Sequence, residues 1–242
     1  MSGEKLYTFN DGVLTFSSNI KTIDRSIVNS NVFNHVQKII IPPNISVIEE
    51  KAFCSCPKLT SVIFSEGVEV INERAFANCK NLKELRFPDS LKTIANYAFQ
   101  GCYSVKDITF GNGLVFIGEG AFDNCNDIKN VYIESIADWC KIDFKNLYSN
   151  PLHFTEFFHV KELKNGNLTI PDGVTRIGSY AFADFHCFNS IRIPPSVKSI
   201  GSFAFYLCED INEVHISDLS AWCKIDFTTN DSNPTFHAET LF

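Results

Sequence analysis

The pair Ala-Phe recurs along this chain at a fixed spacing, and that period constrains the fold more than any other feature. Four of the five steps between successive pairs are 23 residues and one is 60. A period of roughly 20 to 50 residues is typical of solenoids, in which each repeat packs only against its neighbours. The six pairs are Ala52-Phe53, Ala75-Phe76, Ala98-Phe99, Ala121-Phe122, Ala181-Phe182 and Ala204-Phe205.

Each pair stands in a fixed frame of apolar residues. An isoleucine lies four residues before the alanine of every pair. A cysteine lies three residues after the phenylalanine of every pair except Ala181-Phe182, where Phe185 takes its place. A segment of the form Leu-x-x-Val-x-Phe follows, and its alternation predicts a short strand. A turn rich in Pro, Gly, Asp or Asn comes next. We interpret the Ala-Phe-x-x-Cys stretch as a short helix or helical turn. The sequence therefore predicts an α/β repeat solenoid, with a parallel β-sheet on one face and short helices or turns on the other side.

A second kind of unit interrupts the coils. The segment around Trp139-Cys140 returns around Trp222-Cys223, 83 residues later. Ser135 and Asp218 are suitable N-caps for a short helix that carries each tryptophan, and Asp138 would complete a capping box in the first copy. We expect Cys140 and Cys223 to be packed beside their tryptophans.

Turn signals at residues 10–12 and at residues 165–166 predict a β-hairpin before each set of coils. We therefore interpret residues 1–242 as a single solenoid with two sub-modules, residues 6–156 and residues 157–242. Each sub-module consists of a hairpin, Ala-Phe coils and a Trp-Cys unit, and the first also holds one divergent coil.

Composition excludes several classes of function. The net charge of -7 and the absence of basic runs argue against nucleic acid, whose phosphates require Lys and Arg patches. No apolar stretch reaches the roughly 18 residues of a membrane span, so we expect no membrane insertion. The N-terminus lacks the apolar region of a secretory signal, so either the protein is cytosolic as written or a signal was removed.

The cysteines and histidines do not indicate chemistry. Cysteines that recur at the repeat period spread along an axis, whereas metal ligands converge on one point. We interpret them as small buried side chains in a fixed slot, which Phe185 can also occupy. The six histidines form no ligand pattern, and the neighbours His186 and Cys187 lack the geometry of a catalytic pair. We expect no catalytic residue, no metal and no cofactor.

The repeat resembles that of the BspA-like leucine-rich repeat proteins. Residues 193–211, IPPSVKSIGSFAFYLCEDI, match the family's 23-residue unit almost completely, and residues 170–182 match it up to the missing cysteine. The resemblance covers nearly all of residues 14–236. It implies a curved, right-handed leucine-rich repeat solenoid. Members of the family are mostly bacterial or protist surface and secreted proteins linked to adhesion, so a cell-surface or secreted location is implied.

The candidate binding residues are those on the strands that the repeat does not dictate. The residue between Val and Phe points away from the core, and so does the residue two positions earlier. Arg and Tyr are frequent at interface hot spots, and solenoids bind partners on such extended faces. The first row is Ile40, Ile63, Arg86, Thr109, Tyr132, Arg192 and His215, and the second is Lys38, Ser61, Glu84, Asp107, Asn130, Ser190 and Glu213.

These observations predict a non-enzymatic, monomeric protein that binds a protein or glycan partner, a host or matrix protein for example, on its sheet face. We select Ile63, Arg86, Thr109, Tyr132, Arg192, His215, Glu84, Asp107 and Asn130 as the partner-binding residues. Family resemblance favours adhesion at the cell surface. The alternatives are an intracellular, cytoplasmic interaction scaffold and a structural spacer of a longer surface protein.

Overall fold

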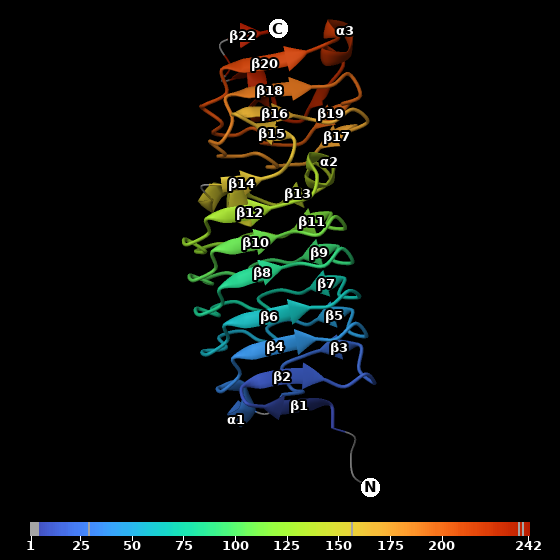
Figure 1. Cartoon of the computed structure of the whole chain (residues 1–242). Helices are drawn as coiled ribbons and strands as arrows, with labels where there is room; N and C mark the ends of the chain where they lie inside the picture. The colour runs from blue at the N-terminus through green and yellow to red at the C-terminus, as the bar shows by residue number, and fades with distance from the viewer. Residues whose placement is uncertain (1–4, 29, 156, 237, 239) are drawn as a thin grey trace.

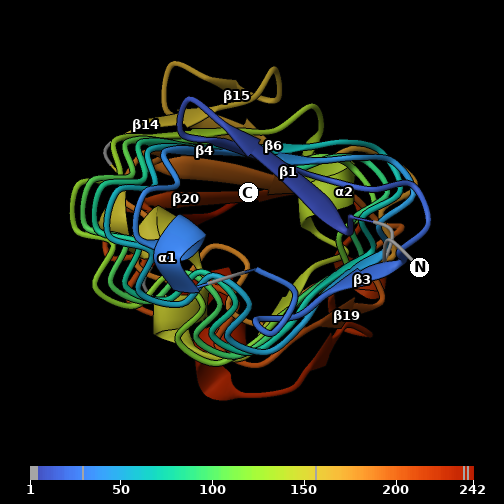
Figure 2. The ribbon, with the colours of Figure 1, turned by 90° about the horizontal axis from the view of Figure 1, so that it is seen from below.

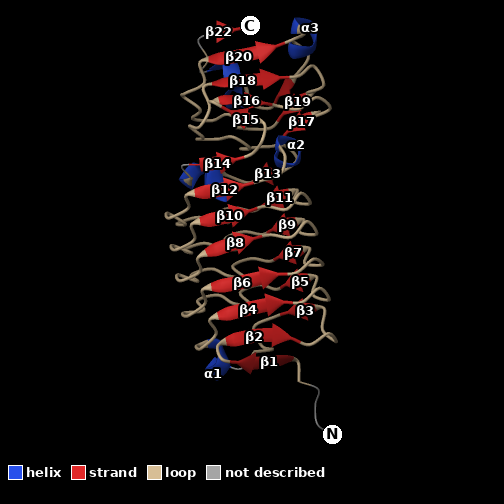
Figure 3. Cartoon of the chain, viewed as in Figure 1, coloured by secondary structure: helices blue, strands red, loops and turns tan. Residues whose placement is uncertain are grey.

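The computed structural model describes residues 5–28, 30–155, 157–236, 238 and 240–242. The chain forms a column of stacked coils whose two ends carry the two termini (Figure 1). Helices in the described residues are at most four residues long (Figure 3), so none is long and apolar enough to cross a membrane. The predicted leucine-rich repeat solenoid is confirmed.

One side of the column consists of three mainly parallel sheets that follow one another along the axis, and we call them together the long sheet. In the middle one β8, β10, β12 and β14 pair in register, so that Thr109 lies between Arg86 and Tyr132. The gap between β6 and β8 is bridged by the Lys83 N–H, which donates to the Thr60 carbonyl over 3.2 Å. The strands are β1 (Tyr7–Asn10), β2 (Val13–Phe16), β4 (Lys38–Ile41), β6 (Ser61–Phe64), β8 (Glu84–Arg86), β10 (Asp107–Thr109), β12 (Asn130–Tyr132), β14 (Phe157–His159), β15 (Leu163–Lys164), β16 (Asn167–Thr169), β18 (Ser190–Ile193), β20 (Glu213–Ile216) and β22 (Thr240–Leu241).

A second side consists of two-residue parallel strands, in which the repeated isoleucines point inward. They form one six-stranded and one three-stranded sheet. The strands are β3 (Thr22–Ile23), β5 (Val47–Ile48), β7 (Val70–Ile71), β9 (Thr93–Ile94), β11 (Phe116–Ile117) and β13 (Asp143–Phe144), then β17 (Arg176–Ile177), β19 (Ser199–Ile200) and β21 (Asp226–Phe227).

The remaining elements are short helices and the two hairpins. Both predicted hairpins are confirmed, since β1 pairs antiparallel with β2 and β15 pairs antiparallel with β16. The helices are α1 (Ser30–Phe33), α2 (Ile136–Trp139) and α3 (Leu219–Trp222), and the 3-10 helices are η1 (Leu147–Ser149), η2 (Pro151–Phe154), η3 (Asn230–Ser232) and η4 (Pro234–Phe236).

The Ala-Phe stretches are turns and not helices, contrary to part of the expectation. The residue before the alanine and the second residue after the phenylalanine have positive φ, as at Arg74 (53°) and Asn78 (60°). Left-handed residues at these two places interrupt any right-handed helix. They also turn successive N–H groups toward the next coil, so that Phe76 donates to the Ala98 carbonyl over 2.8 Å.

The hydrogen bonds between successive Ala-Phe turns form a ladder, which we call the turn ladder. It has a direction along the axis, because its N–H groups all donate to the following coil. Its first carbonyls therefore need a donor from elsewhere. Arg25 in the divergent coil supplies one: its guanidinium donates to the Cys54 carbonyl over 2.7 Å and lies over the Phe33 ring, 4.1 Å from the centroid. The divergent coil thus caps the N-terminal end of the ladder.

The core is a column of phenylalanine rings beside a column of thiols. Phe76 stacks on Phe53 at 5.2 Å and on Phe99 at 5.3 Å between ring centroids. Each framed thiol donates to the carbonyl of the preceding coil's phenylalanine, as Cys102 does to Phe76 over 3.3 Å. All nine cysteines lie in the described residues, and none is in a disulfide. The packing interpretation of the ladder therefore agrees with the structure.

The seam between the two sub-modules is a continuation of the core. Trp139 is buried, and its indole N–H donates to the Ala181 carbonyl over 2.7 Å. Its ring contacts Phe158, which in turn contacts Phe185 at 5.4 Å between centroids. Phe185 occupies the cysteine slot in the coil at the seam, where it packs against Phe158 of the strand β14.

The Trp-Cys helices are capped largely as predicted. Ser135 accepts from the Ala137 N–H over 3.0 Å, and Asp218 accepts from the Ala221 N–H over 3.0 Å. The expected capping box at Asp138 is wrong, because its carboxylate instead accepts from Lys141 Nζ over 2.6 Å.

The expectation that both Trp-Cys cysteines are packed holds for Cys140, which is buried, and is wrong for Cys223, which is exposed. The second sub-module covers Cys140. Nothing in the described residues covers the equivalent surface at Cys223.

Thiol reactivity should separate the cysteines into three groups. Burial raises the pKa of Cys56, Cys125 and Cys208 to about 12 and raises that of Cys102 well above its ordinary value, so these groups remain protonated at pH 8. Only a thiolate attacks a disulfide reagent. We expect Cys223 to react first in the native protein, the half-buried Cys54 and Cys187 more slowly, and six thiols only after unfolding.

The reaction is followed with an aromatic disulfide reagent at pH 8, with and without denaturant. Fewer than nine thiols in the denatured, unreduced protein would contradict the structure. The pKa shifts also fix the sign of a pH effect. The stabilising contribution of the buried thiols is complete below about pH 8.5 and is lost as the pH rises toward 12.

The two tryptophans give a matched pair for the seam. Trp139→Phe keeps a ring but removes the bond to Ala181, which should cost about 1 kcal/mol and lower Tm by about 2–4 °C. Trp222→Phe also shrinks a buried ring but removes no such bond, so it should lower Tm less than Trp139→Phe does. Calorimetry on both variants checks this, and equal shifts would refute the structural role assigned to the Trp139 indole.

Candidate functional site

The two predicted rows lie on the outer surface of the long sheet except at Ser190, which is buried although it was expected to point outward. Ile63 and Tyr132 keep 43% and 37% of their surfaces exposed although they are large apolar or aromatic residues. Arg86 and Arg192 are exposed, and Thr109 is half-buried. Their neighbours on the same strands, such as Ile108, are completely buried. The alternation of the strands therefore directs the non-repeated residues to solvent.

Five of the selected residues surround one hollow in this surface. Glu84, Arg86, Asp107, Thr109 and Tyr132, from β8, β10 and β12, line an open volume of about 450 Å³. We call this group the sheet-face hollow. It offers one cation, two carboxylates, two hydroxyls and one aromatic ring on three adjacent strands.

A fixed network holds the aromatic side of the sheet-face hollow. The imidazole of His159 on β14 stacks on Tyr132 with 4.4 Å between ring centroids and an interplanar angle of 11°. Asn130 Nδ2 donates to Asp107 Oδ1 over 2.8 Å, and Asn130 Oδ1 lies 2.9 Å from His159 Nε2. Because the Asn130 oxygen can only accept, His159 carries its proton on Nε2. The hydrogen bonds that run from Asp107 through Asn130 to His159 thereby position the Tyr132 ring.

The opposite side of the sheet-face hollow is less constrained. Arg86 pairs with Glu84 through Nε and a terminal nitrogen, at 3.3 and 3.2 Å. The side chain of Arg86 is 72% exposed, and an ion pair in such a setting contributes little free energy. The guanidinium can therefore exchange Glu84 for a group on a partner at small cost.

The other selected residues lie apart from this hollow. Ile63 lies on β6, across the bridged gap from β8. Arg192 and His215 are further away, because β14 and the β15–β16 hairpin stand between β12 and β18. Tyr132 and Arg192 follow one another in the predicted row but are not neighbours in the structure, because the predicted hairpin lies between them. Figure 2 shows the hairpin that contains β15 projecting outward from the sheet.

Sequence reasoning missed two outward residues, His159 and Thr169, which pair with Tyr132 and Arg192 respectively. The motif frame does not include them, because they lie in the segment between the two sub-modules. The 83-residue repeat could have indicated His159, because it aligns Tyr132 and His159 with His215 and Phe242, so that each position holds a ring in both copies. In the structure the rings of His215 and Phe242 also stack, with 5.0 Å between centroids.

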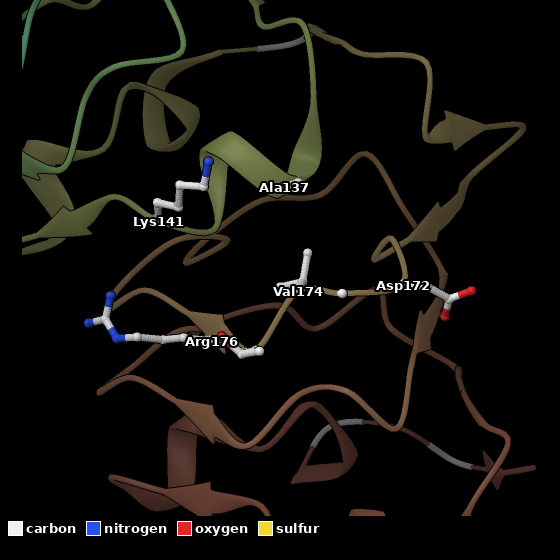
Figure 4. Close-up of a pocket in the computed structure, with 7 residues that line it drawn as sticks. Ala137, Lys141, Asp172, Val174 and Arg176 are labelled. Carbon is white, nitrogen blue, oxygen red and sulfur yellow. The ribbon is translucent and has the colours of Figure 1, made fainter.

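A second cavity lies at the seam beside the first Trp-Cys unit. Its volume is about 550 Å³, and it is lined by Ala137, Lys141, Asp172, Gly173, Val174, Thr175 and Arg176. The charged side chains do not converge: Asp172 and Arg176 point to opposite sides in Figure 4. Lys141 is paired with Asp138 and Arg176 with Asp143. This cavity lacks the converging polar groups of a catalytic site.

No group of three or more His, Cys, Asp or Glu residues within the described part of the chain could hold a metal ion. The histidines do form carboxylate contacts at the seam, where Asp184 lies 2.5 Å from His153 Nδ1 and 3.2 Å from His186 Nε2. We interpret the contact of His153 with Asp184 as a link between the two sub-modules, whereas His186 and Asp184 both belong to the second.

The chain belongs to the BspA-type leucine-rich repeat family. The family model, described as "BspA type Leucine rich repeat region", matches residues 26–150 and 155–233 with six copies. The two matched ranges together hold the Ala-Phe coils of both sub-modules. A search of curated proteins found no match.

Several solved structures resemble the chain at low identity. The pneumococcal vaccine antigen PcpA is 21% identical, with 74% of this chain and 50% of that chain covered and a TM-score of 0.46. A leucine-rich repeat protein from Eubacterium ventriosum is 19% identical, with 87% and 69% covered and a TM-score of 0.47. The T. pallidum leucine-rich repeat protein is 20% identical, with 91% and 81% covered and a TM-score of 0.44. The alignment thus spans half the length of the pneumococcal protein.

The positioning role of His159 can be tested without a partner. His159→Ala removes the stacked ring, so the upfield ring-current shift of the Tyr132 ring protons should disappear, whereas His159→Phe should retain it. The measurement is NMR on protein with labelled tyrosine, with the Tyr132 signal assigned by its loss in Tyr132→Phe. An unchanged Tyr132 signal in His159→Ala would show that the stack does not hold the ring.

Proposed function

We propose that the protein is a non-enzymatic binding protein whose sheet-face hollow recognises a segment of a protein partner. The observation that carries this proposal is the grouping of Arg86, Tyr132 and Asp107 around one open hollow on a rigid sheet. Arg and Tyr are the residue types that dominate interface energetics, and the hollow presents both within one surface.

The chemistry of the hollow favours a polar, partly cationic segment. Glu84 and Asp107 place two negative charges beside the single positive charge of Arg86. A Lys or Arg of the partner could pair with Asp107, while a partner carboxylate could displace Glu84 from Arg86. The face of Tyr132 that His159 does not cover can pack against an apolar side chain. A hollow shared by three strands suits a side chain of a larger partner better than a whole small molecule.

The non-enzymatic part of the proposal rests on geometry. Neither the sheet-face hollow nor the seam cavity brings together a nucleophile, a base and a group that stabilises developing charge. The six fully buried thiols are protonated, hydrogen-bonded or tightly packed, so they are poor nucleophiles.

We infer an adhesion role at the cell surface, because the family is linked to surface proteins and a long solenoid face suits adhesion. One observation favours a second candidate, an intracellular interaction scaffold. None of the nine cysteines is in a disulfide, and unpaired thiols persist most readily in a reducing compartment. Surface labelling of intact source cells with an antibody against the protein separates the two locations.

The binding proposal is tested with a double variant, Arg86→Ala with Tyr132→Ala. Partners are first captured from an extract or surface fraction and identified, and affinity for the purified partner is then measured by calorimetry. Each truncated hot spot costs about 1–2 kcal/mol, so the pair should weaken binding by roughly 30- to 1,000-fold. Both side chains are on the outer surface, so the circular dichroism and Tm of the variant should remain those of the parent.

The matched control is Arg192→Ala, which removes the same type of side chain from the same row on the other side of the hairpin. It should bind within about twofold of the parent. Unchanged affinity in the double variant would sink the proposal and favour the spacer alternative. Loss of binding only after enzymatic deglycosylation of the partner would assign a glycan as the ligand in place of a protein segment.

A further inference from the structure

The C-terminal end of the column repeats a surface that is an internal joint elsewhere in the chain. Residues of the second Trp-Cys unit correspond to those of the first after a shift of 83 residues. Ile136 is completely buried under the second sub-module, whereas its counterpart Leu219 is 62% exposed. Phe236 and Phe242 are also about 60% exposed (61% and 59%). Cys223 is exposed beside them, and Trp222 and Ile225, each 9% exposed, lie just beneath. We call this group the C-terminal end face.

The internal joint shows what the first unit binds. The Gly178 N–H donates to the Cys140 carbonyl over 2.9 Å, and the Phe144 N–H donates to the Ser179 carbonyl over 3.1 Å. The side chain of Asn150 joins the Trp139 indole on the Ala181 carbonyl, at 3.1 Å. These groups connect the first Trp-Cys unit to the hairpin module, residues 157–182.

The C-terminal end face carries the same groups in the same local structure. Asn233 Oδ1 accepts from the Thr235 N–H over 2.9 Å, as Asn150 Oδ1 accepts from the Leu152 N–H over 2.9 Å, so both amides point their NH₂ groups alike. The N–H groups of residues 226 and 228 donate toward β19, which leaves that of Phe227 facing outward. Within the described residues, neither the Trp222 indole N–H nor the Asn233 NH₂ group has an acceptor.

The chain at this end also enters the same path. β22 pairs with β20 as β14 pairs with β12. Phe242 stacks on His215 where His159 stacks on Tyr132, and the Ile216 N–H donates to the Phe242 carbonyl over 2.9 Å. After the first sub-module this path continues directly from β14 into the hairpin β15–β16.

We propose that the C-terminal end face is a docking surface for one further hairpin module of the 157–182 kind. The module is recognised by three features. It supplies a carbonyl in the place of Ala181 for the Trp222 indole, a carbonyl in the place of Ser179 for the Phe227 N–H, and a glycine in the place of Gly178 that approaches Ile225 closely. This inference does not depend on the proposed function of the sheet face.

The glycine excludes the N-terminal end of a second copy as the occupant. A Cβ on Gly178 would lie 1.9 Å from the Ile142 carbonyl oxygen, so only glycine fits at this joint. The frame that aligns Ile23 with Ile177 puts Asp24 in the glycine position of the first hairpin coil. The guanidinium of Arg25, the next residue, already donates to the Cys54 carbonyl of its own chain. The N-terminal hairpin therefore has the shape of the module but not its docking contacts.

The test extends the chain by a second copy of residues 160–242 placed after Phe242. The copy carries Trp222→Phe, so the protein keeps only Trp139 and the original Trp222, and Trp139 is buried in both chains. We expect acrylamide quenching of Trp222 to fall to the level of Trp139. We also expect one cooperative thermal transition with a higher Tm than the parent. Quenching equal to that of the parent would overturn the proposal.

The matched control is the same extended chain with Gly178→Asp in the appended copy only. It should leave Trp222 as quenchable as in the parent, and limited proteolysis should remove the appended segment. Identical protection with Gly and with Asp would show that the close approach is not required and would refute the recognition described here. Dimers of the parent chain with a protected Trp222, seen by light scattering, would assign the face to a second copy instead.

If the extended chain does not yield soluble protein, a synthetic peptide of residues 160–182 is added to the parent chain. Protection of Trp222 by this peptide, and not by its Gly178→Asp form, supports the proposal. Absence of protection at the highest soluble peptide concentration counts against it.

Discussion

The structure depends on backbone hydrogen bonds that pass from each coil to the next on three sides of the column. On the two sheet sides these bonds form parallel ladders, and on the third side the Ala-Phe turns donate in one direction only. A coil has no partner for these groups within itself, and buried amides without partners are costly. Neighbouring coils are therefore required for each coil to be stable, and inward residues can change only within narrow limits of volume.

A ladder of one direction needs different chemistry at its two ends. Exposed carbonyls require a donor, and Arg25 provides a cation at the N-terminal end. Exposed N–H groups require an acceptor, and the 3-10 segments provide one: Gly120 donates to the Asn146 side chain, and Phe203 donates to Thr229 Oγ1. The Trp-Cys unit thus ends one ladder, and its indole and Asn150 donors begin the next. It acts as an adaptor between stacks.

The sequence sufficed to predict the coils, because six copies reveal which positions must be apolar. Periodicity could not predict the backbone of the Ala-Phe turns. Their left-handed residues include Arg74 and Tyr97, whose side chains carry no signal for positive φ. Nor could the frame place His159, since the segment between the sub-modules lies outside the repeat. The 23-residue period sets the register of neighbouring strands, so five candidate residues on consecutive coils meet in one hollow. Arg192 is separated from them by an inserted hairpin.

Rigidity and variability are divided between the two faces of the same strands. Val131 is fixed by the core, while Asn130 and Tyr132 on either side of it are not required by the repeat. Yet Tyr132 is ordered, because β14 brings His159 against it and Asn130 links that imidazole to Asp107. An aromatic ring that is already positioned loses little conformational entropy when a partner binds. The segment that breaks the row of outward residues consists of β14 and the β15–β16 hairpin, and its first strand, β14, orders the aromatic member of the row. The seam therefore contributes to the binding surface as well as to the fold.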